Sequence, residues 1–257
     1  MSNVKINDLI EIARKAGDVI RVGYENVNEI DLKGEIDLVT ETDKKSEKLI
    51  LTEIALKFPD HKVISEETKN QSLPNEHIWY VDPIDGTTNF AHKLPIFSVS
   101  IAYAYKGKFK LGVVYDPIRD EMFSAKSGHG AFLNGGNIKV ADASELKNSL
   151  MVTGFPYDRF QNPDNNLENF SKMALKVRGI RRLGSAALDL CYIAAGRVDG
   201  YWEIRLEIWD IAAGSLIARE AGAIVTDRSG DHDLLKAPYS VCAANPKLHN
   251  KILEVIS

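Results

Sequence analysis

The chain has 257 residues, enough for one large domain or two small ones. Apolar residues make up 44% and charged residues 26% of the sequence, which is close to the average of globular proteins and favours neither a disordered nor a fibrous chain. The formal net charge of -4 argues against a dedicated nucleic-acid binder, so an anionic ligand would need a local feature to attract it.

Two amphipathic helices are expected near the N-terminus. Apolar residues recur at helical spacing over residues 5 to 22 and again over 44 to 58. Thr42 and Asp43 stand where an N-cap of the second helix is expected. The polar segment 31 to 37 between the two helices predicts a loop, with Gly34 as a hinge.

The middle of the chain changes to the patterns that are typical of strands. The expected strands cover residues 63 to 65, 78 to 81, 97 to 105 and 109 to 115. Lys106-Gly-Lys108 predicts a three-residue hairpin between the last two. The Gly-rich segment 128 to 136 lacks the Gly-Lys-Ser/Thr of a phosphate-binding loop, and it fits a turn between strands.

The last third of the chain mixes helices and strands. Helices are expected at 185 to 195, 210 to 221 and 246 to 256, and strands at 200 to 204 and 223 to 227. No repeat or linker-like stretch interrupts the pattern. The sequence therefore predicts one compact α+β unit, or two halves that share a core.

Neither a disulfide nor a targeting segment is indicated. Cys191 and Cys242 lie in apolar stretches, so we expect buried free thiols. The first residues lack the apolar core of a signal peptide, and no stretch approaches the roughly 18 apolar residues that a membrane helix needs. We therefore expect a soluble cytoplasmic protein.

Two aspartates follow the strand expected at 78 to 81. Pro83 fixes one backbone angle and Gly86 permits close backbone approach, so Asp82 and Asp85 could face one point. Hard divalent cations take such oxygen ligands, sometimes together with a backbone carbonyl. Asp-Pro and Asp-Gly also occur in ordinary turns, and composition alone favours a turn over a metal site by about two to one.

Further acidic residues lie at the ends of apolar segments. Glu66 and Glu67 follow the strand expected at 63 to 65, and only one of two consecutive side chains can face a given site. Asp210 and Asp43 stand at expected helix starts, where the ordinary role is an N-cap. The four positions are more suggestive together than singly, because hard cations need several oxygen ligands.

These acidic segments resemble those of the inositol monophosphatase family, in the same order along nearly the whole chain. The motifs are Asp37-Leu-Val-Thr-Glu-Thr-Asp43, Ser65-Glu66-Glu67, Asp82-Pro-Ile-Asp85-Gly-Thr87 and Trp209-Asp210. Bacterial SuhB-like members are the closer match, through Thr153-Gly-Phe-Pro156 and Arg181-Arg-Leu-Gly184-Ser-Ala-Ala-Leu-Asp-Leu190.

The resemblance implies a fold and assigns a separate role to each half of the chain. The expected fold is α+β, a layered α-β-α-β-α sandwich of the sugar and inositol phosphatase superfamily. Residues 1–257 would form a single domain. Its N-terminal half, about 1–142, would carry the metal site, and its C-terminal half, about 143–257, would carry the part that selects the substrate.

The resemblance also implies a site for up to three Mg²⁺ ions. Glu66, Asp82 and the backbone carbonyl of Ile84 would hold the first ion. Asp82, Asp85 and Asp210 would hold the second, and Glu66 with waters would hold a weaker third. Mn²⁺ could replace Mg²⁺, whereas Ca²⁺ and Li⁺ are expected to inhibit.

The implied catalytic residues are Asp43, Thr87 and Glu66. Thr87, hydrogen-bonded to Asp43, would orient and help deprotonate an attacking water that a metal activates. The backbone N–H groups of Gly86 and Thr87 would meet the phosphate. No Cys or Ser stands in an obvious nucleophile motif, so direct attack by water is expected without a covalent intermediate.

The implied activity is Mg²⁺-dependent hydrolysis of a small phosphomonoester, with myo-inositol 1-phosphate as the leading substrate. Fructose 1,6-bisphosphate, histidinol phosphate and 3'-phosphoadenosine 5'-phosphate are the alternatives. The residues expected to contact the substrate are Asp85, Gly86, Thr87, Gly184, Ser185, Ala186, Glu203 and Asp210. Without the resemblance, Glu203 would be nearly as well explained as a solvated acid at a strand end.

Partners are implied only by the resemblance. Family members usually form homodimers, and SuhB-like members are linked to transcription and RNA-processing complexes, so a protein partner there is a rival role. Membrane binding and direct nucleic-acid contact are not expected. Lys33 receives no role. A cluster of Arg178, Arg181 and Arg182 could be a solvated strand edge, an anion contact or a partner surface, and the first is favoured.

Overall fold

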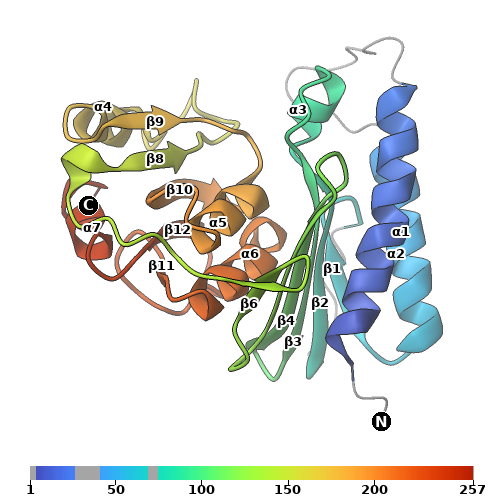
Figure 1. Ribbon diagram of the computed structural model, residues 1–257. Coiled ribbons are helices and arrows are strands. Elements are labelled where there is room, and N and C mark those ends of the chain that lie inside the picture. The colour runs from blue at the N-terminus through green and yellow to red at the C-terminus, as the bar shows by residue number, and fades with distance from the viewer. Residues whose placement is uncertain (1–3, 27–40, 69–74, 257) are drawn as a thin grey trace.

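Helices and sheets alternate in layers in the computed structural model, which describes residues 4–26, 41–68 and 75–256 (Figure 1). The first layer holds α1 (Ile6–Glu25) and α2 (Glu41–Lys57). The second layer is a seven-stranded sheet whose strands lie side by side in chain order. They are β1 (Lys62–Ser65), β2 (His77–Asp85), β3 (Ser98–Tyr105), β4 (Lys108–Asp116), β5 (Glu121–Lys126), β6 (Ala131–Leu133) and β7 (Gly136–Ile138). Only β1 and β2 pair in parallel, and the other neighbours are antiparallel.

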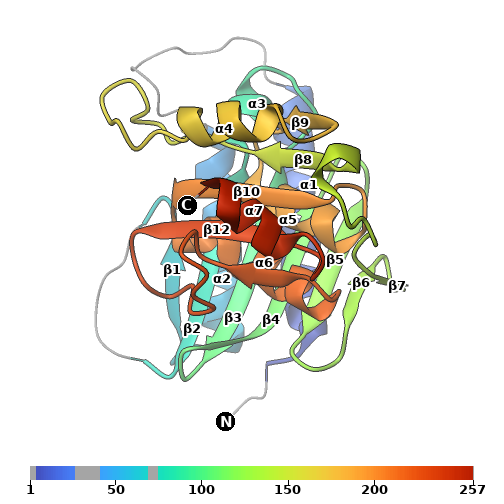
Figure 2. The ribbon, with the colours of Figure 1, turned by 90° about the vertical axis from the view of Figure 1, so that its left-hand side faces the viewer.

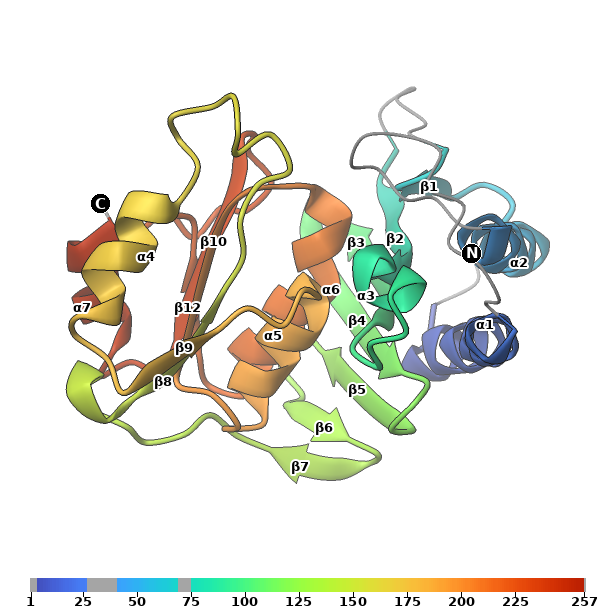
Figure 3. The same ribbon diagram turned by 90° about the horizontal axis from the view of Figure 1, so that it is seen from above.

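The remaining layers come from the second half of the chain. A pair of helices, α5 (Ala186–Ala194) and α6 (Ile208–Glu220), lies between the two sheets (Figure 3). The five-stranded sheet has the order β11 (Ile224–Thr226), β12 (Tyr239–Ala244), β10 (Gly200–Leu206), β8 (Leu150–Thr153), β9 (Gly179–Arg181). Helices α4 (Leu167–Ala174) and α7 (His249–Ile256) cover its outer face (Figure 2). The predicted α-β-α-β-α sandwich is confirmed.

Apolar side chains fill the spaces between these layers in three clusters. Between the first helical layer and the seven-stranded sheet the cluster includes Leu9, Ile12 and Trp79. The largest cluster surrounds α5 and α6, which are buried on all sides and accordingly apolar almost all round. A third cluster, with Trp202, joins the five-stranded sheet to α4 and α7. Each sheet is therefore packed on both faces by apolar side chains.

Most of the expected elements are present, with corrections at their ends. Helix α2 begins at Glu41, so Thr42 and Asp43 lie inside its first turn and the N-cap prediction is wrong. Helix α6 begins at Ile208 after the N-cap Glu207, so Asp210 is its third residue and not its cap. Strand β2 extends beyond residue 81 to Asp85, with an irregular register between Asp82 and Asp85. The last helix begins at His249 rather than at residue 246.

Several short elements had no sequence signal strong enough to predict them. They are β5 to β9, β12, the short helices α3 (Thr87–Ala91) and α4, and the 3-10 turn η1 (Leu146–Asn148). The strands β6 to β9 have three or four residues and show too few alternations to reveal a period. The strands β5 and β12 have six residues each, but apolar and polar residues do not alternate regularly along them. The expected loop at 31 to 37, with Lys33 and Gly34, lies outside the described residues.

The chain passes from one sheet to the other between Ile138 and Leu150. The division expected near residue 142 falls in this connection, while the single-domain organisation stays a prediction. Both cysteines are buried and free, as expected. Among the described residues, no helix is long and apolar enough to cross a membrane.

Candidate active site

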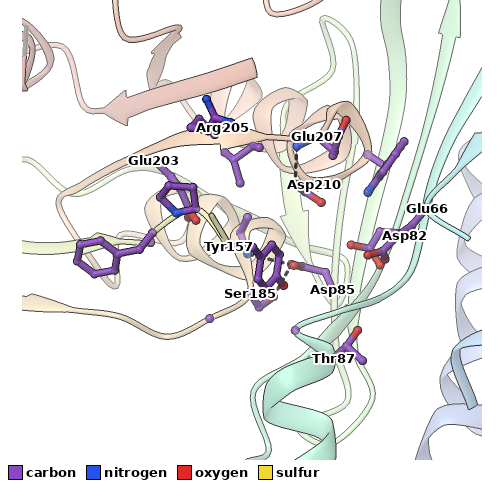
Figure 4. Close-up of a pocket in the computed structure, with 18 of the residues that line it drawn as sticks. Glu66, Asp82, Asp85, Thr87, Tyr157, Ser185, Glu203, Arg205, Glu207 and Asp210 are labelled. Atoms are coloured by element: carbon purple, nitrogen blue, oxygen red, sulfur yellow. Dashed lines mark hydrogen bonds between the residues drawn. The ribbon is translucent and has the colours of Figure 1, made fainter. Parts of the chain in front are cut away.

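A cavity of about 620 Å³ lies where the two halves of the chain meet. Its lining includes every expected site residue except Asp43: Glu66, Asp82, Ile84, Asp85, Gly86, Thr87, Gly184, Ser185, Ala186, Glu203 and Asp210. Figure 4 shows Glu66, Asp82 and Asp85 pointing into this space from the first half, with Asp210 and Glu203 on the side of the second half. Residues far apart in the sequence thus share one cavity.

Glu66 and Asp82 form the most crowded pair of carboxyl groups. Asp82 is 2% exposed, and its Oδ1 accepts a 3.0 Å hydrogen bond from the N–H of Ile84. Burial, followed by repulsion from Glu66, raises the pKa of Asp82 well above its usual range. Burial and the Glu67 charge raise the pKa of Glu66 to about 8, against the opposing effect of a hydrogen bond with Asp82. Within the described part of the chain, the buried Oε2 atom of Glu66 has no hydrogen-bond partner.

Asp85 is held by the start of α5. Its Oδ2 accepts bonds from the Ser185 hydroxyl at 2.5 Å and the Ala187 N–H at 2.7 Å, and its Oδ1 accepts one from the Ala186 N–H at 3.2 Å. Burial raises the pKa of Asp85 to about 6, and these three donors limit the rise because they stabilise the anion. The Ala186 N–H, expected to meet substrate, therefore serves Asp85 here.

Asp210 enters the cavity from the first turn of α6. Its Oδ2 accepts a 2.8 Å bond from the N–H of Glu207, the reciprocal half of a capping box. Burial and the Asp85 charge raise the pKa of Asp210 well above its usual range, and the Glu207 N–H opposes that rise. The capping bond fixes the side chain while its other oxygen keeps its full capacity to accept.

Thr87 and Asp43 lie in contact, as expected. The Thr87 hydroxyl lies 3.1 Å from Oδ1 of Asp43 and 2.9 Å from the carbonyl oxygen of Ile84. Asp43 is fully buried on α2, which explains why it lies behind the cavity wall rather than in it. The two residues connect the first helical layer with the end of β2.

The backbones of the two halves approach closely beside Asp85. Gly86 has φ +101°, and a Cβ there would lie 3.0 Å from the carbonyl oxygen of Ile96 and 3.1 Å from that of Gly184. A side chain would be strained by both the angle and the contacts. Asn89 fastens the same junction, because its amide donates to the carbonyl oxygens of Ile96 (2.8 Å) and Leu183 (2.7 Å).

Glu203 lies on β10 at the far side of the cavity. Its Oε2 accepts a 2.7 Å bond from the Tyr201 hydroxyl, and burial raises its pKa to about 7. Its carboxylate packs against Gly154, where any Cβ would overlap it. Glu203 is therefore a half-buried group of the cavity wall and not a solvated strand end.

Several residues of the cavity were not singled out from the sequence. Tyr157 lies among the acidic groups in Figure 4, and Asp158, the next residue in that loop, forms a 2.6 Å ion pair with Arg205 of β10. Arg205 has φ +57° at a register shift in β10, which a repeating pattern cannot predict. Arg182 also lines the cavity, whereas Arg178 and Arg181 are exposed near the edge strand β9.

The carboxylates fit a hard divalent cation by chemistry. Within residues 4–26, 41–68 and 75–256, no three His, Cys, Asp or Glu side chains form a ready-made ligand group. Two donors occupy Oδ2 of Asp85 and one occupies Oδ1, so Oδ1 can still accept, and a single donor holds Asp210 through Oδ2. The unpartnered Oε2 of Glu66 and the raised carboxyl pKa values mark a place where a cation would stabilise the anions.

Known proteins are similar to this chain over nearly its whole length. The model of the inositol monophosphatase family matches residues 4–257. A Nus factor SuhB of Pasteurella multocida is 45% identical over 257 residues, which cover 99% of this chain and 96% of that protein.

Solved structures are similar over the same length. An inositol monophosphatase from Anabaena (Nostoc) sp. PCC 7120 has a TM-score of 0.89 and 41% identity, covering 98% of this chain and 94% of that one. Inositol monophosphate-bound SaIMPase-II has a TM-score of 0.83 and 29% identity, covering 96% and 91%.

Proposed function

The chain belongs to the inositol monophosphatase family, and we propose that it is a Mg²⁺-dependent phosphatase of small phosphomonoesters. Family membership supports a metal-dependent phosphatase. The observation that carries the proposal is the gathering of Glu66, Asp82, Asp85 and Asp210 around one cavity. The substrate, the metal and the residue roles below are parts of the proposal.

An acidic cavity alone would repel a phosphate monoester, so the proposed activity requires divalent cations. Glu66, Asp82, Asp85, Asp210 and the carbonyl of Ile84 are the proposed ligands. When bound, the cations supply positive charge for the phosphate and lower the pKa of water. Mg²⁺ is the proposed physiological ion because its preferred ligands are carboxylate and carbonyl oxygens.

Thr87 and Asp43 are the proposed pair that orients the attacking water. The Thr87 hydroxyl donates a 3.1 Å hydrogen bond to the Asp43 carboxylate. A lone pair of the hydroxyl oxygen can therefore accept a hydrogen bond from the water. Asp43 is fully buried and fixed on α2, so the pair is rigid. Direct attack needs no covalent intermediate, and both described cysteines are buried away from solvent.

The second half of the chain would bind the leaving group. Glu203, with the segment from Gly184 to Ala186, is the proposed contact for substrate hydroxyls, and Arg182 adds a positive charge at the cavity wall. Myo-inositol 1-phosphate is the leading substrate, supported by the inositol monophosphate-bound relative. Fructose 1,6-bisphosphate, histidinol phosphate and 3'-phosphoadenosine 5'-phosphate remain the alternatives.

Phosphate release from these four substrates, with Mg²⁺ and with EDTA, tests the proposal. We expect Mg²⁺-dependent release that is fastest from myo-inositol 1-phosphate and reduced by Li⁺ or Ca²⁺. Release that is equally fast in EDTA would refute the metal requirement, and a faster rate on another substrate would replace the leading substrate.

A role in a transcription complex is the second candidate, favoured by the relative named Nus factor SuhB. We propose that such a role would use a surface and not the cavity. Capture of transcription proteins by an inactive Asp85→Asn variant, at the wild-type level, would support it. Capture by neither the variant nor the wild type would refute it.

The proposed homodimer is tested by the molar mass in solution.

A further inference from the structure

Helix α2 contacts both segments that carry the proposed metal ligands of the first half, and also Thr87. Asp43 accepts the hydroxyl of Thr87, just after β2. One turn further on, the buried Ser46 donates a 3.1 Å bond to the carbonyl oxygen of Pro83, between Asp82 and Asp85. The next residue, Glu47, reaches the segment that carries Glu66. One side of a single helix thus touches Thr87 and both ligand segments.

Glu47 makes the densest of these contacts. It is 8% exposed, and its Oε1 accepts bonds from the Ser65 hydroxyl and from the Thr68 N–H, the latter at 3.1 Å. Its Oε2 accepts the Thr68 hydroxyl at 2.9 Å. Ser65 and Thr68 are the residues that bracket Glu66 and Glu67 in the sequence. The Glu47 carboxylate therefore holds both ends of the turn that carries Glu66, and none of these bonds involves Glu66 itself.

Three donors converge on Glu47, which suits a carboxylate and no other side chain of this size. A carboxylate only accepts hydrogen bonds, through two oxygens. Glutamine is neutral and has one accepting oxygen, and its amide nitrogen could meet the Thr68 hydroxyl only if that bond reversed its direction. Substitution by glutamine therefore replaces three charge-assisted bonds by weaker neutral ones while keeping the volume.

We propose that Glu47 is a positioning residue that sets the metal affinity of the cavity, because it holds the Ser65–Thr68 turn and with it the Glu66 carboxylate. The inference rests on the metal site of the proposed function. The N–H of Glu66 donates a 3.3 Å bond to the carbonyl oxygen of Val81, which ties the same turn to β2. Its carboxyl group interacts with Asp82, and its buried Oε2 has no hydrogen-bond partner among the described residues, so the direction in which Oε2 points depends on how the turn is held.

Glu47→Gln tests the assignment through metal binding measured by calorimetric titration with Mg²⁺. Loss of a residue that orients a ligand commonly weakens metal binding roughly 10- to 100-fold, and we expect a loss in this range. Phosphatase activity, where present, should return at saturating Mg²⁺, because the ligands themselves are intact. Equal far-ultraviolet circular dichroism and a cooperative melt establish that the variant is folded.

Glu53→Gln is the matched control on the same helix. Glu53 forms a 2.8 Å ion pair with Lys15 of α1 and does not line the cavity. This variant loses the same charge from α2, so a general effect of charge would weaken both variants alike. We expect its Mg²⁺ affinity to match that of the wild type.

Thr68 supplies a second pair of variants that decides the question if Glu47→Gln fails to fold. Thr68→Val removes the donor hydroxyl and should weaken Mg²⁺ binding. Thr68→Ser keeps the hydroxyl and should bind Mg²⁺ as tightly as the wild type. A folded Glu47→Gln protein, or a Thr68→Val protein, that binds Mg²⁺ as tightly as the wild type would overturn the proposal. Mg²⁺ binding without phosphate release in the wild type would instead refute the proposed function alone.

Discussion

At the start of the loop after β8, the backbone of Gly154 lies against the carboxylate of Glu203, and a Cβ at this position would overlap it. We expect Gly154→Ala to displace Glu203 and to raise KM for a polyol phosphate. The increase should be roughly 10-fold or more, the value of one bond to a charged group, with little change in Mg²⁺ affinity. Steady-state kinetics with separate Mg²⁺ titration would measure both.

Gly136→Ala is the control for that substitution. Its nearest contact would be the carbonyl oxygen of Leu133 at 3.4 Å, an ordinary distance, in β7 and away from the cavity lining. An unchanged KM in Gly154→Ala would show that Glu203 does not select the substrate.

The carboxyl group of Glu66 makes stability depend on pH. Its pKa is raised from 4.5 to about 8, chiefly by burial, so the metal-free protein should lose stability as pH rises through this range, where the folded state holds more protons than the unfolded state. Mg²⁺ competes with the proton for the Glu66 carboxyl group, so the stabilisation that Mg²⁺ adds should increase as pH rises. Thermal melts with EDTA and with Mg²⁺, at about pH 6 and about pH 8, would measure this. A Mg²⁺ effect that is larger at the lower pH would contradict the account.

The sequence identified the residues that line the cavity better than the residues that hold them in place. Asp82, Asp85 and Asp210 belong to a recognisable family motif and indeed meet at one cavity. Glu47 has no such signal, and Gly154 lies in the Thr153-Gly-Phe-Pro156 motif without any indication of its contact with Glu203, because both contacts depend on side chains that fold against them from distant segments. Charged residues in an amphipathic helix ordinarily face solvent, and nothing in the pattern of α2 marks Glu47 as buried.

At the scale of elements, α3 and the start of α5 meet through Asn89. Its side chain is 5% exposed and satisfies two carbonyl groups, one from each half of the chain. We expect Asn89→Ala to lower the free energy of unfolding by about 2 kcal/mol, since two part-buried carbonyl groups lose their donor. Urea unfolding would measure the loss.

The exposed Asn137 on β7 provides the comparison. Its replacement by alanine should change the unfolding free energy by less than about 0.5 kcal/mol. Equal losses in the two variants would mean that Asn89 does not fasten the junction.

The helices and longer strands were predictable because their periods extend over many residues. Helix ends were less so: Asp210 has the composition of an N-cap, yet Glu207 takes that position and Asp210 completes the capping box from the third residue. Strand β2 extends through Pro83 because the chain keeps an extended course past the irregular register at Asp82. Local composition cannot distinguish these outcomes, since they depend on tertiary contacts.

At the scale of the whole molecule, the acidic cavity lies where the two halves of the chain meet, and each half contributes part of its lining. Glu66, Asp82 and Asp85 come from the seven-stranded sheet and its connections, and Asp210 comes from the helical layer between the sheets. A net charge of -4 does not attract an anion, and the lining of this cavity is more acidic than basic. Bound cations would reverse that local charge.

Phosphate release by the wild type and by Asp85→Asn, measured over a range of Mg²⁺ concentrations on myo-inositol 1-phosphate, tests the central claim most directly. The substitution removes one charge from the cavity and leaves Ser185, Ala186 and Ala187 to act as donors to a weaker acceptor. We predict Mg²⁺-dependent release by the wild type and a loss of roughly 100-fold or more in the folded variant. A variant that releases phosphate at the wild-type rate in Mg²⁺ would contradict the account.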